Sequence, residues 1–82
     1  MGCAVFGEVA AQIMENRQAD VPISKMMDAI MDTIEDPDAQ AAYKEMVILA
    51  YEQPSYSTKE MRQSMVAEFR NQIELVCYKS GN

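Results

Sequence analysis

Histidine and tryptophan are both absent from this 82-residue chain, which has only two cysteines, three glycines and three prolines. Because histidine is the commonest general base, its absence restricts enzyme mechanisms to those based on carboxylates, lysine or tyrosine. The glycine-rich phosphate loops and the G-x-S-x-G motif of hydrolases are missing as well. Few glycines and prolines also disfavour a disordered or collagen-like chain. We therefore expect one domain over residues 1–82, with no enzymatic activity, cofactor or metal site.

Long apolar runs are missing too, although 49% of the residues are hydrophobic. No segment approaches the roughly 18–20 apolar residues that cross a bilayer. The N-terminus lacks the basic start of a secretory signal, and Glu8 interrupts the apolar stretch that follows. If the protein is exported, we expect this chain to be the mature form without its signal peptide. No run alternates apolar and polar residues long enough to predict a strand.

The charge is unbalanced, with thirteen acidic and seven basic residues and a net charge of −6. The basic residues are scattered, so nothing predicts direct contact with nucleic acid. An acidic surface favours basic partners and repels nucleic acid and anionic lipid. The simpler interpretation is that this charge only keeps a small protein in solution.

Apolar residues recur at helical spacing in four segments. They predict helices at about residues 4–17, 25–35, 37–52 and 58–78. Ser24 is the expected N-cap of the second helix, and Asp36 that of the third, which has Pro37 at its first position. Ser57 and Glu60 form a capping-box pattern before the fourth. Because the connections are short, we expect successive helices to pack as near-antiparallel neighbours around one core.

The two cysteines, Cys3 and Cys77, lie at the two ends of the chain. A bond between them would close nearly the whole chain and stabilise a domain of this size by roughly 4 kcal/mol. It would also indicate an oxidising compartment. Reduced buried thiols are the main alternative, and metal, redox or nucleophilic roles lack the usual accompanying motifs. The predicted fold is an all-α four-helix bundle closed by this disulfide, which would also make the first and fourth helices antiparallel neighbours.

The densest charge lies where the second predicted helix meets the third. Five carboxylates make up this acidic cluster: Asp28, Asp32, Glu35, Asp36 and Asp38. Their spacing does not match a calcium-binding loop, whose central glycine is also missing. The cluster either docks a basic partner or is an ordinary solvated surface, since acids suit a helix N-terminus.

The connection between the third and fourth predicted helices carries Tyr51, Pro54 and Tyr56. Tyrosine is enriched at protein interfaces, and proline lowers the entropy cost of ordering a loop. This loop is therefore the first candidate for a recognition surface. The interpretation we favour is nevertheless structural, with Tyr51 completing the core face of one helix and Tyr56 packing against the start of the next.

Methionine is abundant, with eight residues in the chain. Methionines fill irregular cores, line adaptable partner grooves or bind Cu(I), and core packing is the interpretation we favour. Five of them fall on the predicted apolar faces: Met26, Met27, Met31, Met61 and Met65.

The chain has a layout in which Cys3 lies near the start and Phe69-Arg70-Asn71 comes shortly before Cys77-Tyr78. It resembles that of small uncharacterised exported proteins of Gram-negative bacteria and their phages. Such proteins are short and helical and often have one disulfide between their ends. The resemblance implies a place among periplasmic immunity proteins, enzyme inhibitors or acid-stress chaperones, without selecting one of them.

These observations predict a periplasmic or secreted binding protein. It would act as an inhibitor, immunity or accessory protein for a basic protein, such as a cell-wall hydrolase or a toxin. One alternative is an intracellular acidic regulator that masks the nucleic-acid-binding surface of its target. Another is a periplasmic holdase chaperone, and a homodimer is compatible with each of these.

Overall fold

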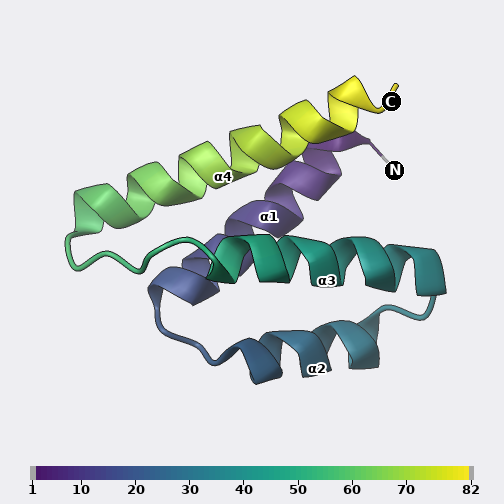
Figure 1. Cartoon of the computed structure of the whole chain (residues 1–82), viewed down its shortest axis with the longest axis horizontal. Helices are drawn as coiled ribbons and strands as arrows, with labels where there is room; N and C mark the ends of the chain where they lie inside the picture. The colour runs from purple at the N-terminus through teal and green to yellow at the C-terminus, as the bar shows by residue number, and fades with distance from the viewer. Residues whose placement is uncertain (1, 82) are drawn as a thin grey trace.

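A computed structural model describes residues 2–81 of the chain and contains four helices and no strand in this range (Figure 1). The helices are α1 (Cys3–Gln18), α2 (Ile23–Thr33), α3 (Pro37–Tyr51) and α4 (Lys59–Lys79). The all-α fold predicted from the periodicity is confirmed, with boundaries that differ by at most two residues.

The predicted start of α3 is confirmed. The Asp36 carboxylate accepts a hydrogen bond from the backbone N–H of Ala39 at 2.9 Å, and Pro37 occupies the first helical position. Asp36 thus satisfies one of the N–H groups that a helix leaves unpaired at its start.

The predicted boundaries of α2 are wrong at both ends. The helix begins at Ile23, so Ser24 lies inside it, and Pro22 is the N-cap residue. Pro22 has extended backbone angles, and its carbonyl accepts the Lys25 N–H at 3.0 Å, which starts the helix before Ser24. At the other end the chain becomes extended after Thr33, so position 35 is not helical.

The capping box predicted for α4 is also wrong. Its N-cap is Thr58, whose hydroxyl accepts the Met61 N–H at 3.2 Å. Ser57 therefore lies one residue too early to cap the helix. Serine and threonine provide the same hydroxyl acceptor, so the sequence did not distinguish between the two neighbours.

The helices pack only partly as expected, since α1 and α4 are the antiparallel neighbours that the disulfide predicts, but other pairs differ. α1 packs along α4 and also contacts α3, whereas α2 packs on α3 (Figure 1). Chain neighbours α1 and α2, and likewise α3 and α4, share little contact, so the expected packing of successive helices holds only for α2 and α3. The reason lies in the connection before α4, which is bonded to the end of α1 and directs α4 onto α1.

All four helices contribute to one core. Its buried residues are Ala10, Ile13, Met14, Ile30, Tyr43, Met46, Val47, Ala50, Phe69 and Ile73. The largest fully buried side chains are those of Phe69, Met14 and Val47. α2 contributes only Ile30 as a fully buried residue, which agrees with its packing mainly on α3.

The methionines follow the core interpretation only in part. Met14 and Met46 are buried, and three of the five assigned to apolar faces are half-buried: Met26, Met27 and Met65. Met31 and Met61 are exposed, so their assignment to the core is wrong. Met61 lies in the first turn of α4, and Met31 lies on α2, which covers only one side of α3.

The disulfide between Cys3 and Cys77 is present, with 5.6 Å between the two Cα atoms and both residues buried. It joins the first residue of α1 to the last turn of α4, which run antiparallel. One turn further along α1, buried Gly7 lies against the side chain of Glu74, which would have to move to make room for a Cβ atom. The two helices therefore approach closely at the disulfide end of the molecule.

Candidate functional site

The connection between α3 and α4 is bonded to the C-terminal end of α1. The buried side chain of Gln18, 3% exposed, donates to the Pro54 carbonyl at 2.9 Å and accepts the Tyr56 N–H at 2.8 Å. Arg17 donates through Nε to the Gln53 carbonyl at 3.0 Å. Gln18 follows Met14 by four residues on the buried face of α1, a polar residue at a core position that the sequence analysis did not single out.

We expect Gln18→Ala to lower the free energy of unfolding by about 1–3 kcal/mol, because a partly buried carbonyl and N–H lose their partner. Gln12→Ala is the matched control, since Gln12 is exposed on the same helix. Its effect should stay within about 0.5 kcal/mol. Urea unfolding of both variants measures the difference, and equal midpoints would contradict the anchoring role of Gln18.

Tyr51 links α3 to the α1–α2 connection. Its hydroxyl donates to the Val21 carbonyl, and the Arg17 guanidinium lies 5.3 Å from the centre of its ring. Burial raises the pKa of the Tyr51 hydroxyl, and the positive charge of Arg17 opposes this rise. These contacts give Tyr51 a structural role.

We expect the pKa of Tyr51 in the folded protein to exceed the ordinary tyrosine value of about 10. A raised pKa means that the folded state favours the neutral hydroxyl. The contribution of the neutral Tyr51 hydroxyl to the stability of the folded state is therefore complete below about pH 10. It is lost as the pH rises through the pKa of the folded state. A ¹³Cζ NMR titration measures this, with Tyr51→Phe assigning the resonance. Titration at or below pH 10 would contradict the expectation.

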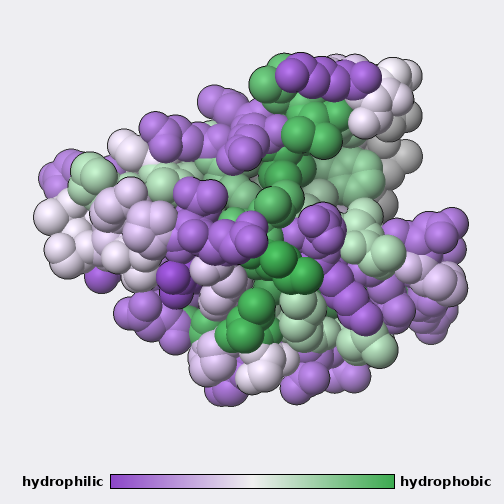
Figure 2. All heavy atoms as spheres, viewed as in Figure 1, coloured by the Kyte–Doolittle hydropathy of each residue, from purple (hydrophilic) through white to green (hydrophobic). Residues whose placement is uncertain are grey.

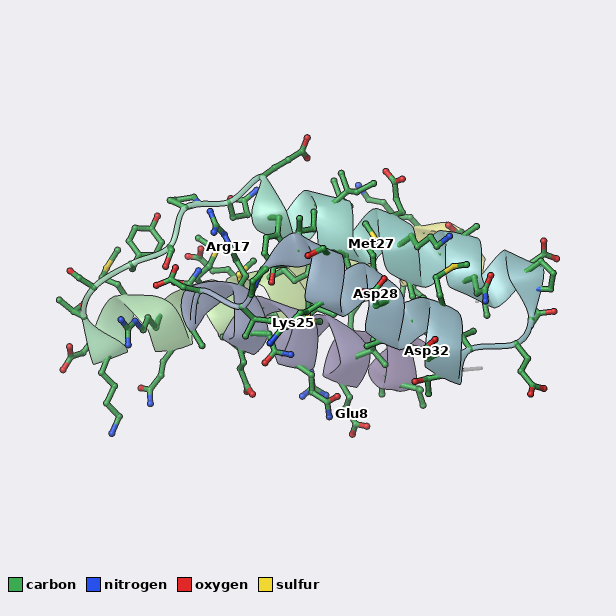
Figure 3. All side chains as sticks on the ribbon, turned by 90° about the horizontal axis from the view of Figure 1, so that it is seen from below. Glu8, Arg17, Lys25, Met27, Asp28 and Asp32 are labelled. Carbon is green, nitrogen blue, oxygen red and sulfur yellow. A yellow bond between two sulfur atoms is a disulfide. The ribbon has the colours of Figure 1, made fainter. Side chains whose placement is uncertain are left out.

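The five carboxylates of the acidic cluster are all exposed. Asp28 and Asp32 lie one turn apart on α2 (Figure 3), and the other three lie in the α2–α3 turn and the first turn of α3. Between residues 2 and 81 the structure shows no basic side chain in an ion pair with any of them. α3 is 15 residues, or about 22 Å, long and separates this cluster from the connection that carries Pro54 and Tyr56. The two predicted recognition surfaces are therefore two separate places.

An apolar groove lies between α3 and α4 and is floored by α1. Its volume is about 310 Å³, and Figure 2 shows apolar side chains gathered between these helices. It is lined by Phe6, Ala42, Glu45, Met46, Leu49, Ile73, Val76, Cys77 and Ser80. Of the predicted site residues, only Cys77 is among them. The signal in the sequence is Val76, which lies three residues after Ile73 at helical spacing and is nevertheless 56% exposed.

The α3 wall of this groove is acidic. Glu45 is the charged side chain in the lining, and it is exposed. Asp38 lies seven residues earlier and therefore on the same face of α3, two turns away. One member of the acidic cluster thus extends the line of negative charge beyond the end of the groove.

A wider groove of about 620 Å³ lies between α1 and α4, towards the end away from the disulfide. Its lining mixes charges of both signs, with Arg62 and Arg70 beside Glu15. Arg62 donates through Nε to the Tyr56 carbonyl at 2.7 Å, and Arg70 pairs with Glu74 at 3.0 Å. Because both arginines already have partners within the protein, the apolar groove is the better candidate for a binding site.

Comparison with protein-family models, curated proteins and solved structures found no match. No helix within residues 2–81 has the length and apolar character needed to cross a membrane. The same residues contain no group of three or more histidine, cysteine, aspartate or glutamate side chains placed to hold a metal ion.

Proposed function

We propose that this protein is a non-enzymatic binding protein that acts by covering part of a basic partner protein. The observation that supports this most is the apolar groove between α3 and α4 with its acidic α3 wall. Apolar surface supplies affinity when it is removed from water. An inhibitor, an immunity protein and an accessory protein all act through a surface of this kind.

The charge distribution supports a basic partner. The chain has a net charge of −6, and its five clustered carboxylates are exposed without basic partners in the described part of the chain. Complementary charge accelerates association and discriminates against wrong partners more than it adds affinity. In this proposal the acidic cluster attracts the partner, and the groove holds it.

The disulfide supports an exported protein. Disulfides persist in the periplasm and outside the cell, and are rare in the reducing cytosol. The bond between Cys3 and Cys77 thus favours a periplasmic or secreted binding protein over an intracellular regulator. A cell-wall hydrolase or a secreted toxin would be a partner of the appropriate class.

Site-specific photo-crosslinking tests this function. A photoreactive amino acid replaces Val76 in the groove or, as the control, its exposed neighbour Leu75 outside the groove lining. We expect a basic exported protein to crosslink from position 76 and not from position 75, and its complex with the purified protein to weaken as salt rises. Equal products from both positions, or none, would overturn the proposal.

A further inference from the structure

We infer that the apolar groove accommodates an amphipathic α-helix of the partner, with lysine or arginine on the side that faces α3. This inference rests on the proposed function and specifies the shape and charge of the bound segment.

The arrangement of the helices leaves a place open for such a segment. In a four-helix bundle each helix packs against two neighbours. Here α1 contacts both α3 and α4, but α3 and α4 share little contact, because α2 packs on α3 instead of bridging them. The position between α3 and α4 therefore lacks the helix that would complete the bundle, and the groove lies there.

The two walls of the groove have the geometry of helix-packing faces. On α3 the lining residues follow the spacing i, i+3, i+4 and i+7, and they are Ala42, Glu45, Met46 and Leu49. On α4, Ile73, Val76 and Cys77 follow i, i+3 and i+4. Rows of this spacing form the ridges between which the side chains of another helix pack. A helix laid into an apolar groove is one of the common modes of peptide recognition.

The charge of the groove determines which helix fits. The charged residue of the lining is Glu45 on the α3 wall, whereas the α4 wall is lined by uncharged residues. Asp38 lies two turns before Glu45 on the same face of α3, beyond the end of the groove. A partner helix with cations on its α3 side meets these carboxylates, and a helix with carboxylates there is repelled. The segment from Asp38 to Leu49 spans about 16 Å, so an occupant of about three turns matches it.

The test uses a synthetic 15-residue peptide of leucine and lysine, with leucines at i, i+3, i+4 and i+7. Its binding to the intact, oxidised protein is followed by isothermal titration calorimetry. Two comparison peptides are used. The first has the same composition in scrambled order, and the second has glutamate in place of each lysine. We expect the scrambled peptide to bind at least ~10-fold more weakly, since burial of one apolar anchor corresponds to about a tenfold change. The glutamate peptide keeps its leucines but should also bind more weakly, because its carboxylates are repelled by those of the protein.

Two protein variants separate groove binding from general attraction to an acidic protein. Val76→Asp and Leu75→Asp each add one negative charge at adjacent, similarly exposed positions of α4, 56% and 54%, but only Val76 lines the groove. We expect Val76→Asp to weaken binding of the lysine peptide ~10-fold or more. Leu75→Asp should leave the affinity unchanged or slightly higher. Circular dichroism checks that both variants keep their helices.

The role of the acidic wall is tested in the same way. Glu45→Gln should weaken binding about 3- to 5-fold, the effect of one exposed charge pair, whereas Glu68→Gln, on the exposed surface of α4 outside the groove, should not. Equal weakening by Val76→Asp and Leu75→Asp, or equal binding of the scrambled peptide, would overturn the helix inference. In that case a basic protein crosslinked from position 76 would still support the proposed function, and the absence of that product would overturn both.

Discussion

Replacing Cys3 and Cys77 together by serine is expected to lower the free energy of unfolding by about 4 kcal/mol. The bond joins residues 74 positions apart, so its loss frees almost the whole unfolded chain. In the chain-entropy account, the stabilisation grows with the length of the closed loop. For a domain whose total stability is about 5–15 kcal/mol, this is a large fraction.

Urea unfolding of the double serine variant and of the wild type measures this loss. The wild type in reducing agent is the control, and its midpoint should match that of the variant, because serine is close to a reduced cysteine in size. A loss below about 1 kcal/mol would show that packing between α1 and α4 holds the ends together without the bond.

The same change should also affect binding. Cys77 lines the apolar groove, and the bond keeps the end of α4 on α1, opposite α3. If α4 frays at this end, the α4 wall loses its position relative to the α3 wall. We therefore expect the reduced protein to bind the lysine peptide more weakly than the oxidised protein does, although the acidic wall remains unchanged.

Phe69→Ala is expected to lower the free energy of unfolding by about 3–5 kcal/mol. Phe69 is 2% exposed and belongs to the core cluster that joins all four helices. Removing its ring eliminates buried apolar surface and leaves a cavity that its neighbours fill only in part. The effect should appear as a lower urea midpoint and a lower melting temperature.

Met61→Ala is the matched control for this prediction. Met61 lies two turns before Phe69 on α4, on the same apolar stripe of the sequence, but it is 46% exposed. Its replacement should change stability by no more than about 0.5 kcal/mol. If Phe69→Ala leaves no folded protein, Phe69→Leu provides a measurable loss of about 1 kcal/mol. Similar losses for Phe69→Ala and Met61→Ala would contradict the core described here.

The sequence indicates only a few residues of the candidate site. Asp38 and Cys77 were noted, but for separate reasons, and neither predicts a groove. Tyr51 and Tyr56 are candidate recognition residues by sequence, yet neither lines the groove. Tyr51 ends α3 and donates to the Val21 carbonyl, and Tyr56 lies in the α3–α4 connection, where its N–H donates to Gln18 of α1. Val76 shares the helical spacing of buried Phe69 and Ile73 and is nevertheless exposed, because helical spacing shows that a face is apolar and not what covers it.

The sequence by itself determined the number of helices, their approximate bounds and the cap at Asp36, because periodicity and capping depend on residues three or four positions apart. The placement of two cysteines at the ends likewise predicted their bond. The same bond predicted that α1 and α4 are antiparallel neighbours, and only the tertiary structure decided that α4 makes little contact with α3. That choice depends on Gln18 and on contacts between segments more than thirty residues apart, which leave no local pattern in the chain. The groove between α3 and α4 follows from this choice.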